Sequence, residues 1–496
     1  MPGLTPGLRL TRIHLTEFIP SQQTMTRFAV VSRAREEAPG PNPNAARYAI
    51  EQLARRAQVD DATIQSWRVD DSDRDYLTVY LGAGTRKRVR FPRIRNGAWD
   101  QINRGIFHTS TAAWWPGANR NCEVIPDFKI PFSSSSQTHS GPLFIADAPE
   151  SFTCAVDLPT SILLTLSRFE EMFPSPKDIH GRFPASASIS WQNGFLHRPI
   201  VDEYGVAFEQ VVRSLLPGWI PAERRLRVRI SHDVDEIGLP FSFRSAVAKT
   251  FRYARPFETF RDLGAAIFGI HATSQVQLKQ LVQLAAKRRL DIAVHWKCSE
   301  CGPHDTGYDV HDRRISELMN ELKSLGAEMG IHPSYVTFQS PKQLRGEVES
   351  LVALLGERSA GGRQDYLRWS PNTWVEWDKL GLAYDSSVGF ADHVGFRAGT
   401  CVPYRPWLWS EQREAKLVEI PLLVMDSTLY GYMKLSANQA LMVVKDIVDR
   451  CRAVGGVFTI AWHNTTLLRS GYSQIYRKIL DEIAFSAKFD WRAASA

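Results

Sequence analysis

The sequence predicts an α/β protein built on a parallel sheet, either open or closed into a barrel. Two observations carry this prediction. After about residue 226, short apolar runs with strand character alternate with amphipathic segments of helical spacing, an order of elements typical of parallel sheets. Acidic and histidine residues also stand at the ends of several of these runs, and in α/β barrels the active site lies at such strand ends.

The elements of this second part follow one another regularly along the chain. In one helical segment, Ile315, Leu318 and Leu322 recur on the same face, so this helix would bury one side. Helices are expected at 275–289, 314–326, 344–356 and 437–455. Strands are expected at 227–231, 291–296, 327–332, 417–426 and 456–463.

The first part of the chain is expected to form a separate domain. With 496 residues the chain exceeds the usual size of one compact domain. A helix at 199–218 would stop at its final Pro-Gly pair, and the pattern of elements changes after it. We therefore expect an accessory domain at 25–222 and a second domain at 223–496. A strand at 75–82 and a helix at 161–173 are expected within the first.

Composition limits the classes of protein that the chain can belong to. The hydrophobic share of 44% and the charged share of 23% are ordinary for a globular protein, and the net charge of +7 is a hint of an acidic partner or substrate. No apolar run reaches the roughly 18 residues of a membrane span. Residues 1–24 lack the apolar core of a secretory signal and are expected to be a disordered extension, with Met25 as an alternative start.

The cysteines and the densest basic run of the sequence add two expectations. The six cysteines suit a reducing compartment, so we expect a cytoplasmic protein. The basic residues Arg86, Arg88 and Arg90 alternate with Val89 and Phe91, which favours the solvent face of a strand over a polyanion-binding patch, and no nucleic-acid partner is expected. No phosphate-binding loop, dinucleotide fingerprint or serine-centred elbow occurs.

The candidate chemistry begins directly after the first strand of the second part. His232, Asp233 and Asp235 stand together there, and His332, Asp426 and His463 end later strands. Close carboxylates repel each other and usually stay together because a cation, a proton or a reaction needs them. Two carboxylates with imidazoles suit hydrolysis by metal-bound water, in which one carboxylate accepts a proton. An exposed acidic turn is the alternative.

Five short motifs add a family resemblance. They occur in the order expected of a polysaccharide deacetylase of the NodB-homology superfamily, and they resemble the branch found with bacterial surface-polysaccharide genes. The segment 166–205 is similar to the accessory domain that precedes the deacetylase in that branch. The resemblance implies a distorted (β/α) barrel preceded by a smaller α/β accessory domain. The motifs are "ISHDVD" (230–235), "EMGIHPSY" (328–335), "GFRAGTC" (395–401), "VMDS" (424–427) and "IAWHN" (460–464).

The resemblance also implies roles for individual residues. Asp233 resembles the catalytic base, Arg397 the arginine that orients it, and His463 the acid that protonates the departing amine, with Asp426 in the fourth motif. Asp235 and His332 resemble ligands of a divalent metal, Zn²⁺ being expected. The implied reaction removes an N-acetyl group from a sugar of a bacterial surface polysaccharide or its precursor. Residues expected to contact that sugar are Ser334, Tyr335, Trp407 and Asn464.

The sequence departs from the family pattern at the metal site. Val336 stands where the superfamily has a second histidine, and Asp365 stands where this branch often has one. Asp365 could supply an oxygen instead, giving Asp235, His332 and Asp365 as ligands. Two alternatives remain open: a catalytically inactive glycan-binding protein, and an amidohydrolase that acts on a non-sugar amide.

Two further segments allow more than one interpretation. His295, Cys298, Cys301 and His304 could form a structural zinc site, but all four lie within ten residues, whereas such sites usually draw ligands from separated segments, so a plain loop is favoured. The segment 389–409 is rich in glycine and aromatic residues. It is either a packed loop or a stacking wall for sugar rings that would use Trp407 and Trp409.

Overall fold

The computed structural model describes most of the chain from residue 42 onward. Contacts divide the chain into Met1–Ala38 and Pro39–Ala496, and every described residue lies in the second unit; the expected extension 1–24 lies outside the described residues. We call 42–222 the N-terminal region and 223–484 the C-terminal region. No described helix is both long and apolar enough to cross a bilayer. The described residues are 42–94, 96–114, 125–133, 141–237, 270–299, 304–305, 308–356, 361–464, 466 and 472–484.

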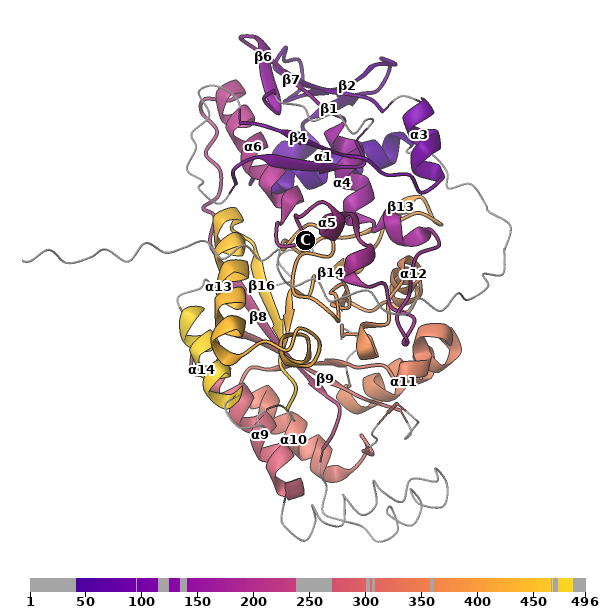
Figure 1. The fold of residues 1–496 in the computed structure, drawn as a ribbon, viewed down its shortest axis with the longest axis vertical. Coiled ribbons are helices and arrows are strands. Elements are labelled where there is room, and N and C mark those ends of the chain that lie inside the picture. The colour runs from indigo at the N-terminus through magenta and orange to yellow at the C-terminus, as the bar shows by residue number, and fades with distance from the viewer. Residues whose placement is uncertain are drawn as a thin grey trace, which may run out of the picture. The chain divides into compact units, whose positions relative to one another are not determined.

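The N-terminal region is a mixed sheet with helices packed against it (Figure 1). Its strands follow the order β1-β2-β3-β7-β6, in which only the β3–β7 pair is parallel. A separate ribbon pairs β4 with β5. The strands are β1 (Arg68–Asp70), β2 (Tyr76–Tyr80), β3 (Arg88–Pro92), β4 (Thr109–Ala112), β5 (Phe128–Pro131), β6 (Phe144–Ala148) and β7 (Ser151–Cys154).

The basic run of the sequence lies on β3. Val89 and Phe91 are fully buried, while Arg88 and Arg90 are partly exposed. The alternation therefore places the arginines on the solvent side of a strand, as expected. The helices of this region are α1 (Pro43–Arg56), α2 (Asp61–Gln65), α3 (Asn96–Asn103), α4 (Leu158–Leu166), α5 (Ile189–Gln192) and α6 (Ile200–Leu215).

The C-terminal region contains a parallel sheet of five strands in the order β10-β9-β8-β16-β15, with every neighbouring pair parallel. Isolated parallel bridges continue from Ile331 to Gly362 and from Gly362 to Asp385. Beyond them β11 pairs with β14, also in parallel. No closed sheet occurs among the described residues, so the α/β class is confirmed and a closed barrel is not shown. The strands are β8 (Arg227–Val234), β9 (Asp291–Trp296), β10 (Glu328–Ile331), β11 (Tyr384–Asp385), β12 (Trp407–Leu408), β13 (Arg413–Glu414), β14 (Val418–Glu419), β15 (Val424–Met425) and β16 (Val457–Ala461).

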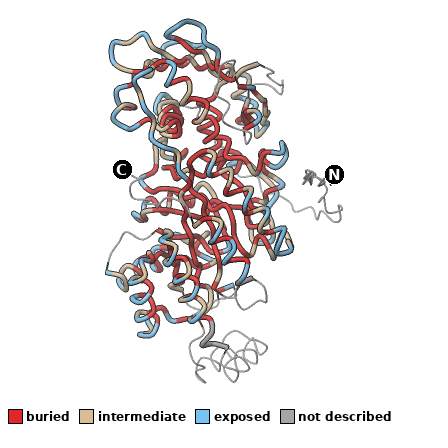
Figure 2. The backbone as a smooth tube through the Cα atoms, turned by 90° about the vertical axis from the view of Figure 1, so that its left-hand side faces the viewer, coloured by how far each residue is buried: buried red, intermediate tan, exposed pale blue. Residues whose placement is uncertain are grey.

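Amphipathic helices flank this sheet, and the expected ones are confirmed (Figure 1). Figure 2 shows the central strands as buried, whereas the helices carry exposed residues along one side. Helix α13 illustrates why the boundaries fall where they do, because Ser436 and Gln439 form a capping box and Gly455 ends the helix in the left-handed conformation. The helices are α9 (Ile270–Ala286), α10 (Arg313–Ser324), α11 (Pro341–Leu355), α12 (Pro371–Lys379), α13 (Ala437–Val454) and α14 (Tyr472–Glu482).

Two expected elements are wrong in extent. The strand expected at 417–426 is split into β14 and β15, because Pro421 between them has no N–H to donate to a neighbouring strand; its carbonyl instead accepts from the Thr459 hydroxyl. The helix expected at 161–173 is α4, which ends at Leu166. Arg168 then adopts a left-handed conformation with φ of 52° before a short 3₁₀ turn.

Candidate functional site

Charged side chains from five parallel strands meet at one edge of the C-terminal sheet. Because the carboxyl ends of parallel strands share an edge, residues that follow these strands can reach one another. Asp235 follows β8, Lys297 follows β9, His332 follows β10, Asp426 follows β15 and His463 lies two residues beyond β16. All five line a cavity of about 470 Å³, a size that suits a small ligand.

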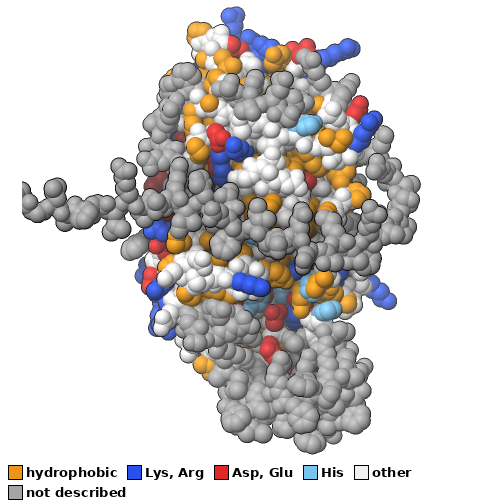
Figure 3. Space-filling model, in the orientation of Figure 1, with side chains coloured by type: hydrophobic (Ala, Val, Ile, Leu, Met, Phe, Trp, Pro, Cys, Tyr) orange, Lys and Arg blue, Asp and Glu red, His pale blue; other side chains and the backbone are white. Residues whose placement is uncertain are grey.

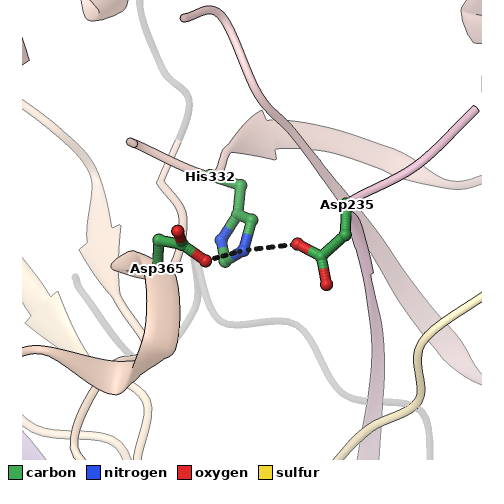
Figure 4. A group of neighbouring side chains, drawn as sticks. All are labelled: Asp235, His332 and Asp365. Carbon is green, nitrogen blue, oxygen red and sulfur yellow. Dashed lines mark ion pairs between the residues drawn. The ribbon is translucent and has the colours of Figure 1, made fainter. Parts of the chain in front are cut away.

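Three of the cavity residues have the arrangement of a metal-binding group (Figure 4). His332 Nε2 lies 3.3 Å from Asp235 Oδ1 and 3.2 Å from Asp365 Oδ1, and the three candidate ligand atoms all lie within 4.8 Å of one another. His332 Nδ1 donates to the Arg363 carbonyl at 2.7 Å, so Nε2 is the nitrogen that faces the carboxylates. A backbone acceptor on the other ring nitrogen is a common support for metal-ligating histidines.

The electrostatics of this group favour a cation. Burial by itself lowers the pKa of His332, but the Asp233, Asp235 and Asp365 carboxylates raise it to about 10. The position between the two facing carboxylates therefore attracts positive charge, and one nitrogen with two carboxylate oxygens is a donor set that suits Zn²⁺ and other divalent first-row ions. The residues present fit a divalent metal.

A strained turn directs Asp365 into the cavity. Tyr366 and Leu367, which follow it, both have φ of 55°, a left-handed conformation that non-glycine residues rarely adopt. Such strain is concentrated at functional sites. The Tyr366 amide donates to Asp365 Oδ1 at 3.0 Å, so the turn also fixes the carboxylate itself.

Lys297 lies beside two of the three candidate ligands. Its Nζ is 3.2 Å from Asp365 Oδ2, 3.5 Å from Asp235 Oδ1 and 3.2 Å from Asp305 Oδ1. Burial opposes its charge, but these carboxylates raise the pKa of Lys297 above its ordinary value. Three carboxylates thus share the Lys297 ammonium group.

Asp233 is held as a buried carboxylate at the cavity wall. Arg363 Nη1 donates to its Oδ1 at 2.9 Å and to its Oδ2 at 3.0 Å, and His295 Nδ1 lies 2.8 Å from Oδ1. Burial raises the pKa of Asp233, yet the Arg363 guanidinium holds it well below its usual range. The pairing therefore keeps Asp233 unprotonated at the cavity, which is the state in which a carboxylate can accept a proton.

Arg397, the arginine expected to orient Asp233, contacts a different carboxylate. Its Nε and Nη2 donate to Glu171 at 2.9 Å and 2.5 Å, and its Nη1 donates to the Gly389 carbonyl. This places Arg397 against the N-terminal region, and Arg397 is not among the residues that line the cavity. Arg363 has the contact that was expected of Arg397.

His463 and Asp426 form a second pair at the cavity. His463 Nδ1 lies 2.6 Å from Asp426 Oδ1, and the His463 amide donates to Oδ2 at 2.9 Å. His463 Nε2 lies 3.7 Å from Asp235 Oδ2. Burial lowers the pKa of His463, but Asp426 raises it to about 10, so the imidazole carries a proton that it can give up.

None of the four residues expected to contact the sugar is among those lining this cavity. The Ser334 hydroxyl donates to Glu347 at 2.5 Å, and the Asn464 amide donates to the Glu236 carbonyl at 2.8 Å. Tyr335 packs under the Arg368 guanidinium, with 3.9 Å between the guanidinium carbon and the ring centre. Trp407 is 3% exposed and packs against Tyr48.

The structure also bears on the possible zinc site at 295–304 and on the role of the segment 389–409. Both ring nitrogens of His295 have partners, Asp233 and the Tyr384 hydroxyl, so His295 is not placed to bind zinc with Cys298; Cys301 lies outside the described residues. The segment 389–409 is a packed loop in which Trp407 is buried and the Trp409 ring N–H donates to the Ser167 hydroxyl at 2.8 Å.

Several residues of the cavity were not predicted from the sequence. Lys297 stands directly after the expected strand 291–296, so its strand-end position was a usable signal. Arg363 stands two residues before Asp365 and could have been proposed with it. Arg182 and Tyr432, which also line the cavity, lie outside the strand-end pattern, and no sequence signal marks them.

Comparisons with known proteins give distant likenesses. A family of unknown function (DUF7033) matches residues 103–217, and a search of curated proteins found no match. A solved structure from Mycobacterium smegmatis, provisionally described as a polysaccharide deacetylase, is similar with 16% identity and a TM-score of 0.40 over 56% of this chain and 91% of its own. One from Bordetella bronchiseptica, provisionally described as a polysaccharide deacetylase involved in O-antigen biosynthesis, has 14% identity and a TM-score of 0.25 over 53% of this chain and 84% of its own. Both descriptions name the family that the motifs resemble.

Proposed function

We propose that the protein is a metal-dependent hydrolase that removes N-acetyl groups from a sugar of a bacterial surface polysaccharide or its precursor. One observation supports the proposal: the candidate metal ligands Asp235, His332 and Asp365 line the same cavity as the Asp233 carboxylate and the His463 imidazole. A distorted (β/α) barrel accounts for the row of parallel strands that brings them together.

Each group has a role in amide hydrolysis. An ion held by Asp235, His332 and Asp365 would polarise the acetamide carbonyl and make a bound water more acidic. Asp233 accepts the proton of the attacking water, and its pairing with Arg363 keeps it ionised until then. His463 donates a proton from Nε2 to the departing amine nitrogen, while Asp426 holds the opposite ring nitrogen.

The proposal includes a cytoplasmic location, which favours a lipid-linked or nucleotide-linked precursor over finished polymer. The scattered cysteines support a reducing compartment. Cell fractionation tests this part separately, and recovery of the protein from the periplasm would contradict it.

A glycan-binding protein without turnover is the second candidate. Lys297 supports it, because its ammonium group lies within 3.5 Å of two candidate ligands and already supplies one positive charge there. If the Lys297 ammonium group balances the charge of the candidate ligands, the cavity would bind sugars without a metal.

Metal analysis and acetate release separate the candidates. We expect one divalent ion per chain after metal loading, together with acetate release from some members of a panel of N-acetylated sugars. Absence of both would favour the glycan-binding protein, and release from simple amides but from no sugar would favour an amidohydrolase of another class.

A further inference from the structure

Part of the cavity wall comes from the N-terminal region. Arg182 comes from that region and lines the cavity together with Tyr366 and Tyr432. Its Nη1 donates to the Tyr366 carbonyl at 3.0 Å and its Nη2 to the Tyr432 hydroxyl at 2.7 Å, while its Nε donates to Asp178 at 2.7 Å. One arginine therefore links three segments around the cavity. On the face drawn in Figure 3, histidine and acidic side chains lie next to one another and are bordered by hydrophobic ones.

Arg182 has donors left over. A guanidinium group carries five N–H donors, and these three contacts use one each. Arg182 is 6% exposed, so its remaining N–H groups have little access to bulk water and gain from a ligand acceptor. The Tyr432 hydroxyl accepts from Arg182, which leaves its own proton free to donate.

The two parts of the cavity therefore have opposite character. We call the part that carries the candidate metal ligands the inner part. It presents the carboxylates of Asp235, Asp365 and Asp426, which suit a cation and a proton donor. The outer part presents the donors of Arg182 and Tyr432. Tyr366 and Tyr432, 37% and 45% exposed, add aromatic surface against which a sugar ring can pack.

We propose that Arg182 and Tyr432 form a subsite for a negatively charged group, a carboxylate or a phosphate, carried by the substrate. A guanidinium group matches the planar, paired acceptors of such groups better than any other side chain. The proposal rests on the proposed function and narrows its substrate to acidic N-acetylated sugars. The net charge of +7 agrees with an acidic substrate.

The subsite is also fixed relative to the candidate metal ligands. Arg182 binds the carbonyl of Tyr366, the residue directly after Asp365. A substrate anion on Arg182 would therefore lie close to the turn that carries Asp365, with the acetamide of the same sugar or its neighbour pointing toward the inner part. In this arrangement Arg182 of the N-terminal region helps to select the substrate, and the residues assigned to the chemistry belong to the C-terminal region.

The test compares acidic and neutral substrates in matched variants. Turnover of a neutral N-acetylhexosamine, its uronic acid and its phosphate is measured with metal-loaded wild type and with Arg182→Gln. We expect kcat/KM for the acidic sugars relative to the neutral one to fall about tenfold or more in the variant, mainly through KM. The uronic acid and the phosphate distinguish the two sources of charge. Arg450→Gln is the control, because Arg450 pairs with Asp446 four residues earlier, as Arg182 does with Asp178, but does not line the cavity; its ratio should stay at the wild-type value.

A second variant and a binding measurement test the subsite independently of Arg182→Gln and of turnover. Tyr432→Phe removes the hydroxyl and should lower the same ratio several-fold even if Arg182→Gln does not fold. Calorimetric binding of the deacetylated sugars to wild type gives a readout that needs no turnover. Tighter binding of the acidic amine without acetate release would overturn the hydrolase and leave the subsite standing. Acetate release with no preference for acidic sugars, or an unchanged ratio in the folded variants, would overturn the subsite and leave the hydrolase standing.

Discussion

Two buried arginine–carboxylate pairs in this protein look alike and lie in different surroundings. Arg363 contacts Asp233 at 2.9 Å, and Arg397 contacts Glu171 at 2.5 Å. All four side chains are almost completely buried. Asp233 nevertheless lines the cavity, whereas Glu171 is not among the residues that line it and is held by Arg397 and Arg168.

The difference shows that the pairing itself does not mark a catalytic group. A buried ion pair contributes little net stability, although removing one partner is costly. What distinguishes Asp233 is its place at the carboxyl end of β8, next to a candidate metal site. Glu171 joins two regions of the chain and has no comparable neighbour.

The largest effect is expected at the candidate metal ligands, which line the cavity together with Asp233. Asp235→Asn and His332→Gln should reduce both acetate release and bound metal to background, because each removes one of three ligands. Plasma mass spectrometry of the dialysed protein measures the metal. Acetate release by the metal-free protein would contradict a role for the metal ion in the reaction.

Asp233→Asn should separate chemistry from metal binding. We expect kcat to fall by about 10³-fold, within the range for losing a general base, while metal content stays at the wild-type level. Glu171→Gln is the matched control, since it changes a carboxylate of the other pair; per folded molecule it should keep its kcat. Equal loss of kcat in both variants would erase the distinction between the pairs.

Replacing the arginines tests the comparison from the other side. Arg363→Gln should lower kcat by about 10²-fold, because Asp233 loses the charge that holds it ionised. Arg397→Gln should keep its kcat per folded molecule and lower the free energy of unfolding by about 3 kcal/mol, the cost of leaving a buried carboxylate without its partner. Urea unfolding followed by circular dichroism measures the second effect, and the reverse pattern would contradict the assignment of Arg363.

The Glu171 pair should also be visible in the pH dependence of stability. Burial raises the pKa of Glu171, but Arg397 and Arg168 lower it below its ordinary value of 4.5. A carboxylate with a depressed pKa in the folded state stabilises the fold at pH above its ordinary value, and that contribution is lost as the pH falls through the folded-state pKa. Unfolding curves at several pH values should therefore show a steeper loss below about pH 4.5 in wild type than in Glu171→Gln; parallel curves would refute it.

The smallest effect is expected at Trp407, which the sequence placed at the sugar. Because Trp407 packs against Tyr48 away from the cavity, Trp407→Phe should change KM less than about twofold. A tenfold rise in KM, measured with the best sugar of the panel, would indicate that Trp407 contacts the substrate and would contradict this prediction.

The strand ends explain how much of the site the sequence could predict. Asp235, His332, Asp426 and His463 follow short apolar strands, so their convergence required only the rule that parallel strands share an edge. Asp365 came from the family resemblance and lies on a strained turn that sequence patterns do not reveal. The choice between Arg363 and Arg397 depended on how distant loops pack, as did the burial of Trp407. Pro421, which splits the expected strand, is visible in the sequence, so this break is predictable from the residue type alone.

The most direct test of the central claim is the position of a bound metal ion. A crystal of the zinc-loaded protein, with diffraction measured on both sides of the zinc absorption edge, locates the ion by anomalous scattering. We predict one strong peak within coordinating distance of Asp235, His332 and Asp365, with Asp233 and His463 facing it. A peak elsewhere, or none at a zinc concentration that restores activity, would contradict the proposed site.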